Sequence, residues 1–254
     1  NNKNEYFKLN KIGRNTMSND IYSNNSISTL KDEQQVRQRP AVIFGTNDIE
    51  GCAHSILEII ANSIDEVREG FGSKLLVKVD EDNVVTVQDN GRGVPMDWNE
   101  AEGKYNWELV FCTLYASGKY DDSNYESSLG LNGLGATATQ YASEFMRVES
   151  IRDNKKYTMN FEKGRPVGEL KVEEASGEVT GTTITFKPDR EVFTGINVPL
   201  EYYLDVLRRQ AMIHRGLDIN LQYKGNDIDL YYENGAKDFI ELICDKRMGD
   251  KIIS

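Results

Sequence analysis

The sequence has no GxxxxGKS or GxxxxGKT segment, which excludes the phosphate-binding loop of many nucleotide-hydrolysing proteins. Its three cysteines, Cys52, Cys112 and Cys244, show no CxxC spacing, which excludes a disulfide framework and a paired-cysteine metal site. Scattered and odd in number, they are typical of reduced thiols, so we expect a cytoplasmic protein. No apolar run approaches the roughly 20 residues that cross a bilayer, and the N-terminus lacks the apolar segment of a signal peptide. We therefore expect no membrane partner.

Positive charge is also scarce. Lys and Arg number 30 against 41 Asp and Glu, which gives a formal net charge of −11. This balance argues against the chain itself gripping nucleic acid, because neutralising phosphates requires a basic surface. It leaves open an enzyme whose DNA-binding parts lie elsewhere. The composition, 39% hydrophobic and 28% charged, is that of a globular protein able to bury a core.

The order of patterns along the chain predicts an α+β fold. Residues 1–28 are rich in Asn and Ser and read as an arm or leader. Residues 41–45 read as a strand or turn after Pro40. Helices are expected at about 31–39, 51–69, 106–116, 133–143 and 199–214, and strands at 75–79, 84–88, 145–151, 156–162, 168–172, 182–187 and near 217–231.

The predicted helix 51–69 has one polar side. At 100° per residue, His54, Glu58, Asn62 and Asp65 fall within roughly 80° of one another, opposite an arc of Ile, Leu and Val. A merely solvated face is the alternative interpretation, but such faces usually also carry Lys and Arg. The pattern therefore favours a functional stripe.

These residue types suit the transfer of a phosphoryl group to water. Glu58 can accept a proton from the attacking water, and His54, one turn earlier, can orient it. Asn62, one turn later, offers a neutral oxygen to Mg2+, which takes few protein ligands. A partly buried structural histidine is the alternative for His54.

Two glycine-rich segments follow in the chain. Asp89, at the end of a predicted strand, begins Asp-Asn-Gly-Arg-Gly and can accept a hydrogen bond from an adenine amino group. Residues 129–135 (LGLNGLG) precede a predicted helix, where backbone N–H groups can meet phosphate, and Lys119 adds a cation nearby. Each segment alone also fits an ordinary turn or loop. Together with the helix stripe they predict a site for ATP that lacks a P-loop.

The ordered set E-x-x-x-N, D-x-G-x-G and G-x-x-G-x-G resembles the GHKL ATPase superfamily. Residues 36–40 (VRQRP) with Gly45, residues 114–122 (LYASGKYDD) and residues 180–182 (TGT) resemble more specific segments of the ATPase domain of bacterial type IIA topoisomerase B subunits, such as gyrase B and its counterpart in topoisomerase IV. The resemblance runs from about Tyr22 to the end. Leu129, Asn132 and Ala61 depart from the family pattern and indicate a divergent branch.

The resemblance implies a two-layer sandwich, the GHKL or Bergerat fold, in which helices cover one face of a mixed β-sheet. Residues 1–30 would form an arm that reaches the nucleotide of the other copy in a dimer, residues 31–234 the ATPase domain, and residues 235–254 the start of a truncated transducer domain. A transducer lysine contacts the γ-phosphate in that family, so we expect this chain alone to bind ATP but to turn it over poorly.

The resemblance also assigns roles. Glu58 would be the general base, His54 its assistant and Asn62 the ligand of Mg2+. Arg152 matches an arginine that contacts coumarin-type inhibitors in relatives. The implied ATP-binding positions are Tyr22, Asn62, Glu66, Asp89, Gly91, Arg92, Gly93, Val94, Pro95, Gly118, Lys119, Tyr125, Gly130, Leu131, Asn132, Gly133, Leu134, Gly135, Arg152 and Thr182.

The function implied is an ATP-operated clamp that couples closure of a homodimer to DNA strand passage. It implies an A-type subunit that carries the DNA-cleaving tyrosine, and DNA contacted mainly outside this chain. The alternative is an ATP-gated protein-interaction module of the chaperone or mismatch-repair type. Gyrase and topoisomerase IV activities are not distinguished, because that difference lies in the DNA-wrapping region of the A-type subunit.

Overall fold

The computed structural model describes residues 31–114, 134–238, 240 and 244, all within the unit Lys31–Ser254. The expected N-terminal arm with Tyr22 lies outside the described residues. So do Gly118, Lys119, Tyr125, Gly130, Leu131, Asn132 and Gly133 of the expected phosphate site. Among the described residues, no helix is both long enough and apolar enough to cross a membrane.

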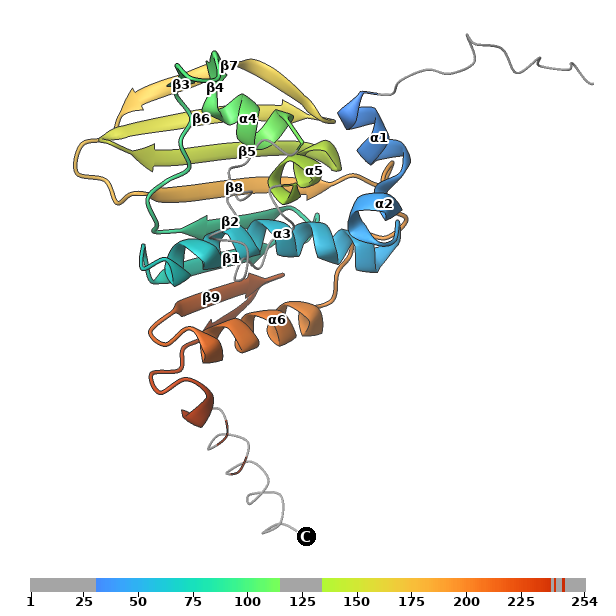
Figure 1. Cartoon of the computed structure of the whole chain (residues 1–254). Helices are drawn as coiled ribbons and strands as arrows, with labels where there is room; N and C mark the ends of the chain where they lie inside the picture. Colours follow the sequence, from blue (N-terminus) through green and yellow to red (C-terminus); the bar gives the residue numbers. More distant parts are fainter. Residues whose placement is uncertain (1–30, 115–133, 239, 241–243, 245–254) are drawn as a thin grey trace, which may run out of the picture. The chain divides into compact units, whose positions relative to one another are not determined.

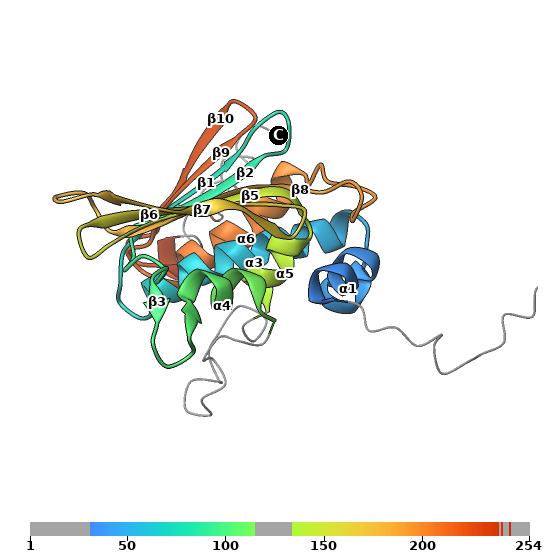
Figure 2. The same cartoon turned by 90° about the horizontal axis from the view of Figure 1, so that it is seen from above.

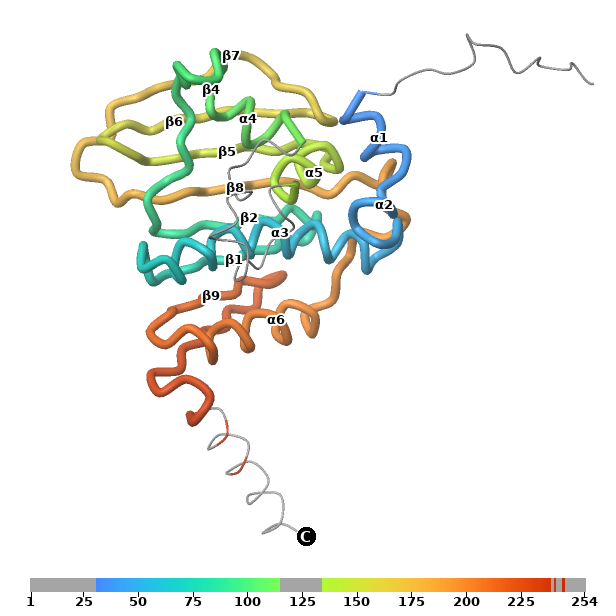
Figure 3. The backbone as a smooth tube through the Cα atoms, in the orientation of Figure 1, coloured from blue at the N-terminus to red at the C-terminus, as the bar shows by residue number. Residues whose placement is uncertain are grey.

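An eight-stranded sheet organises the described part of the chain (Figure 1). Its order is β10-β9-β1-β2-β8-β5-β6-β7, and only the β1–β9 pair is parallel. Strand β9 thus lies beside β1, although well over a hundred residues separate them, as the backbone path in Figure 3 shows. The strands are β1 (Lys74–Val79), β2 (Val85–Asp89), β5 (Ser143–Arg152), β6 (Lys155–Glu162), β7 (Arg165–Glu174), β8 (Gly181–Pro188), β9 (Asp218–Tyr223) and β10 (Asn226–Leu230). Strands β3 (Trp98–Asn99) and β4 (Lys104–Tyr105) form a separate hairpin.

The main helices cover one face of this sheet (Figure 2). They are α3 (Ile49–Arg68), α4 (Asn106–Cys112), α5 (Gly135–Tyr141) and α6 (Leu200–Ile213), preceded by α1 (Asp32–Gln38) and α2 (Pro40–Phe44). A mixed sheet with helices on one face is the α+β two-layer sandwich that the sequence predicts, which is thereby confirmed.

The strands alternate as a half-buried sheet requires. Leu75, Val77 and Val79 of β1 are buried beneath the helices, whereas Lys74 and Lys78 are exposed. Helix α3 meets this layer with Ile56, Ile60 and Ile64, each fully buried. Burial of one such side chain contributes about 1.5–3 kcal/mol, so this layer holds α3 against the sheet.

One element expectation is wrong. Residues 41–45, predicted as a strand or turn, form α2, because Pro40 occupies the first helical position, where its missing N–H costs nothing. Helix α3 begins at Ile49, two residues earlier than expected, where the Asp48 carboxylate caps it by accepting a hydrogen bond from Glu50 N. Helix α4 ends at Cys112, before the expected residue 116.

Arg37, from the VRQRP segment, joins three parts of the fold. Its Nη2 lies 2.7 Å from Asp189 Oδ2 and 3.0 Å from Glu191 Oε2, both in the segment after β8. Its Nη1 donates to the carbonyl oxygen of Tyr141 at the end of α5, 3.1 Å away. Asp189 is buried, and Arg37 is its cationic partner.

We expect Arg37→Ala to lower the free energy of unfolding by about 2–4 kcal/mol, because it leaves a buried carboxylate without its cation. Urea denaturation measures the change. Arg39→Ala, two residues along and exposed, is the control and should change stability by less than about 0.5 kcal/mol. Equal effects of the two substitutions would contradict this role for Arg37.

Candidate nucleotide-binding site

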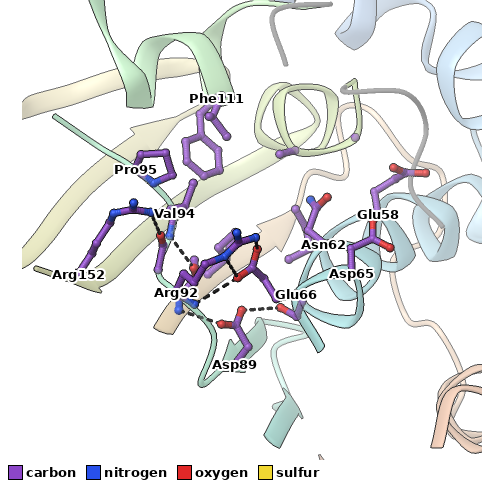
Figure 4. Close-up of a pocket in the computed structure, with 18 of the residues that line it drawn as sticks. Glu58, Asn62, Asp65, Glu66, Asp89, Arg92, Val94, Pro95, Phe111 and Arg152 are labelled. Carbon is purple, nitrogen blue, oxygen red and sulfur yellow. Dashed lines mark hydrogen bonds and ion pairs between the residues drawn. The ribbon is translucent and has the colours of Figure 1, made fainter. Parts of the chain in front are cut away.

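A cavity of about 420 Å³ opens beside α3, between the loop after β2, strand β8 and helices α4 and α5 (Figure 4). Its volume lies in the range of small-molecule pockets, about 300–1,000 Å³. The sequence-predicted positions that line it are Glu58, Asn62, Glu66, Asp89, Arg92, Gly93, Val94, Pro95, Gly135, Arg152 and Thr182. The fold thus brings together residues from segments more than a hundred positions apart.

Glu58 lies at one end of the cavity and is only 3% exposed. The solvated-face interpretation of the α3 stripe is therefore wrong at this residue. Gly135, the first residue of α5, packs directly against it, and a Cβ at this position would collide with the Glu58 carboxylate. Glycine is therefore required at the last position of the predicted loop, because the Glu58 side chain lies too close for a Cβ.

His54 does not line the cavity, but it contacts the carboxylate that does. Its Nε2 lies 3.6 Å from Glu58 Oε1, and its Nδ1 lies 3.2 Å from the carbonyl oxygen of Phe44. A carbonyl only accepts, so we assign the donating proton to Nδ1. Nε2 then faces Glu58 Oε1 at a distance longer than that of a hydrogen bond.

Asp89 also lines the cavity, apart from Glu58 in Figure 4, and is 7% exposed. Its Oδ1 accepts from Gly91 N at 2.9 Å and from Thr182 N at 3.2 Å, and its Oδ2 accepts from Ser63 Oγ at 2.8 Å. Burial raises the pKa of Asp89 above its ordinary value, and these three hydrogen bonds offset only part of that rise. Gly91 therefore acts on the site through its backbone N–H.

The wall beside Asp89 depends on a close backbone approach. Gly93 has φ +78°, a conformation that other residues rarely adopt, and a Cβ there would lie 2.5 Å from the carbonyl oxygen of Ile151. Both its backbone conformation and the lack of space therefore require glycine. Val94 N donates to Thr182 Oγ1 at 3.0 Å, and Ser150 Oγ donates to Val94 O at 2.7 Å. These bonds join the loop after β2 to β5 and β8.

Arg92 forms the outer rim. Its Nε and Nη2 donate to the two Glu66 oxygens at 3.0 and 2.7 Å, and Nη2 also donates to Glu69 at 2.7 Å. Its guanidinium lies 3.8 Å from the centre of the Phe71 ring. Burial alone would raise the pKa of Glu66, but the hydrogen bonds and charge of Arg92 lower it. Arg152 donates from Nη1 to Gly93 O at 3.2 Å.

The sequence patterns gave no site role to several lining residues. They are Ile59, Ser63, Glu69, Val110, Phe111, Ala136 and Ile184, whereas Asp65 was assigned only to the polar stripe. Asp65 stands on the predicted polar stripe, where it pairs with Arg68 at 3.4 Å. Ser63 could have been found by asking which helix hydroxyl would satisfy a buried acid at the end of β2. Leu134, an expected phosphate contact, precedes α5 and does not line the cavity.

The raised pKa of Asp89 determines how its contribution to stability changes with pH. The folded protein binds this proton more tightly than the unfolded chain, so the contribution of Asp89 is full below 3.8, its ordinary pKa, and is lost as pH rises through the folded value. We therefore expect the stability of Asp89→Asn, taken relative to the parent at the same pH, to be higher at about pH 8 than at about pH 4.5. Urea denaturation at the two pH values measures this, and a difference that is constant or falls with pH would contradict it.

Comparison with known proteins agrees with this geometry. The family profile of the histidine kinase-, DNA gyrase B-, and HSP90-like ATPases matches residues 47–192, more than half of the chain. The chain is 34% identical over 227 residues to the B subunit of DNA topoisomerase 4 from Staphylococcus epidermidis, covering 87% of this chain and 34% of that protein. It is 36% identical over 231 residues to the corresponding protein of Bacillus subtilis, covering 89% of this chain and 35% of that protein. The B subunit of DNA gyrase from Spiroplasma citri is 33% identical over 236 residues, covering 91% and 37%.

A solved structure is also similar, the 43K ATPase domain of Thermus thermophilus gyrase B in complex with an aminocoumarin. The TM-score is 0.72 at 30% sequence identity, over 84% of this chain and 55% of that one. The chain spans about a third of the length of the curated relatives it matches. It belongs to the histidine kinase-, DNA gyrase B- and HSP90-like ATPase family, and within that family it is similar to the ATPase region of type II topoisomerase B subunits.

Proposed function

We propose that this chain is the ATP-binding and ATP-hydrolysing clamp of a type II DNA topoisomerase. One observation carries the proposal: a single cavity is lined by two buried carboxylates that lie apart in Figure 4, Glu58 against Gly135 and Asp89 among three donors. The first suits a base for water and the second suits recognition of an adenine amino group. The topoisomerase names of the relatives favour this function over a chaperone or mismatch-repair module.

Adenine recognition follows from the remaining hydrogen-bonding capacity of Asp89. Its Oδ1 already accepts two hydrogen bonds, whereas Oδ2 accepts one from Ser63 among the described residues and keeps room for another. An amino N–H that reaches Oδ2 would bind a buried acceptor in a small cavity. Ile59, Val94 and Ile184, which line the same cavity, supply apolar walls for a flat base.

Hydrolysis would use the part of the cavity at Glu58. Glu58 takes the proton of the attacking water, and His54 holds Glu58 in place and shares the proton. Asn62, one turn after Glu58 on α3, also lines the cavity, and its neutral oxygen fits the ligand preference of Mg2+. When bound, Mg2+ would neutralise charge on the phosphates. Gly135 leaves the space that Glu58 needs.

The proposal includes partners. ATP binding would close a homodimer of this domain, with residues 1–30 as the arm that reaches the other copy, and residues 235–254 would lead into a transducer. An A-type subunit would cleave DNA, which is contacted mainly outside this chain, in the cytoplasm. Arg92 and Arg152 line the cavity opening, which supports binding of coumarin-type inhibitors such as the one bound by the Thermus thermophilus relative.

We expect Asp89→Asn to weaken binding of a non-hydrolysable ATP analogue by about 1–3 kcal/mol, or roughly 5- to 150-fold. The amide presents a donor where adenine also presents one. Calorimetry near neutral pH measures the affinity, with the exposed Asp82→Asn as control. Unchanged affinity in Asp89→Asn would exclude Asp89 as the adenine acceptor.

We expect Glu58→Gln to reduce ATP hydrolysis by about 10²- to 10⁴-fold and to change analogue affinity by less than about threefold, because the base acts only in the transition state. The rate is measured in the full-length subunit that contains this chain. Glu50→Gln, at the exposed start of the same helix, is the matched control. Hydrolysis at the parent rate in Glu58→Gln would disprove the assignment.

The topoisomerase function is tested by combining the full-length subunit with its A-type subunit. Relaxed circular DNA and linked DNA circles are the two substrates, so that supercoiling and decatenation are separated. The parent should act on at least one of them in the presence of ATP, and the Glu58→Gln protein on neither. ATP hydrolysis without any change in DNA topology would favour the protein-interaction alternative.

A further inference from the structure

The two tryptophans of the chain lie close together outside the nucleotide cavity, Trp98 at the surface and Trp107 behind it. Residues 97–105, which contain β3, the turn and β4, form a surface feature that we call the aromatic hairpin. Trp98 and Tyr105 are directly paired across its strands, with ring centroids 5.2 Å apart and planes at 82°. They are 48% and 41% exposed, so the pair presents two large aromatic rings to solvent.

The aromatic hairpin is held rigidly. Asn99 Oδ1 accepts from Ala101 N and Glu102 N at 3.1 and 3.2 Å, and Gly103 completes the turn with φ +61°. Asp97 Oδ2 accepts from Tyr157 Oη of β6 at 2.8 Å, which fixes the hairpin to the sheet. A rigid surface loses little conformational entropy when it binds a partner.

The rings continue inward to the nucleotide cavity. Tyr105 stacks on Trp107 with centroids 6.4 Å apart, and Trp107 contacts Phe161 at 6.0 Å. Phe161 in turn contacts Phe111 at 5.9 Å, and Phe111 lines the cavity. Single exposed aromatic side chains are common on surfaces. A fixed pair, supported by a row of rings from behind, is more typical of a recognition surface.

The charge of the hairpin indicates which partner fits. Glu100 and Glu102 are exposed in the turn, and neither forms an ion pair within the described part of the chain. Lys104 is the single basic residue of the hairpin. Uncompensated carboxylates beside aromatic faces attract a cation, and they repel nucleic acid phosphates. Arginine stacks on rings through its flat, weakly hydrated guanidinium better than lysine does.

We propose that the aromatic hairpin is a docking site for an arginine side chain of a partner protein. The guanidinium stacks on the exposed ring of Trp98, beside Tyr105, and Glu100 and Glu102 supply the opposite charge. The proposal is independent of ATP hydrolysis, because none of these four residues lines the cavity.

The two tryptophans make a direct test possible in the unaltered chain, because its amide spectrum contains only two indole N–H signals. The probes are the peptides acetyl-(Arg-Gly)4-amide, acetyl-(Lys-Gly)4-amide and acetyl-(Glu-Gly)4-amide, titrated into ¹⁵N-labelled protein. We expect the arginine peptide to shift the Trp98 signal and to bind about threefold or more tightly than the lysine peptide. The glutamate peptide should not bind.

Variants separate this site from general attraction to an acidic protein. Trp98→Ala, and separately the double variant Glu100→Gln with Glu102→Gln, should weaken the arginine peptide about fivefold. The matched control, Glu81→Gln with Asp82→Asn, removes two exposed acids from the β1–β2 turn and should weaken it less than about twofold. The Glu100 and Glu102 changes are at exposed positions, so they test the site even if Trp98→Ala unfolds.

Three results would overturn the proposal. Arginine and lysine peptides could bind equally. The control could lose as much affinity as the hairpin double variant. A short DNA duplex could shift the Trp98 signal, which would indicate nucleic acid as the occupant.

Discussion

The contact between Gly135 and Glu58 is the constraint on which the site depends. It brings the start of α5, and hence the end of the glycine-rich segment, against the carboxylate of α3 with no space for a side chain. Helix α3 in turn is held by isoleucines that are buried against the sheet. The sheet therefore sets where Glu58 lies, and Glu58 sets where the glycine-rich segment must enter its helix.

The same sheet also positions Asp89, which lines the cavity. Strand β2 ends at Asp89, and β8, its antiparallel neighbour, places Thr182 N within hydrogen-bonding distance of the carboxylate. The pKa values of Asp89 and Glu66, which face the same cavity, shift in opposite directions. Burial raises the pKa of Asp89, whereas for Glu66 burial is outweighed by the hydrogen bonds and charge of Arg92 together, which lower its pKa. The cavity thus offers a buried hydrogen-bond acceptor in its wall and a fixed ion pair at its rim.

Much of this arrangement could be predicted from the sequence, because local periodicity carries it. The polar side of α3 put Glu58 and Asn62 on one face, and β1 and β2 were predicted as strands close to their observed bounds. Ser63, Glu69 and Phe111 could not be assigned to the site, because their roles depend on contacts between elements distant in sequence. Helix α2 was mispredicted because Pro40 was taken to stop one helix, when it also begins another.

The carboxylates of the cavity and those of the aromatic hairpin differ in whether they have partners of opposite charge or hydrogen-bond donors. In the cavity, the carboxylates of Glu66 and Glu69 are bound to Arg92, and Asp89 is surrounded by donors, so these acids are structurally compensated. Glu100 and Glu102 of the aromatic hairpin have no such compensation within the described residues. The chain has a net charge of −11, and Glu100 and Glu102 add local negative charge beside the exposed rings of the hairpin. The proposed arginine partner of the hairpin follows from that local charge.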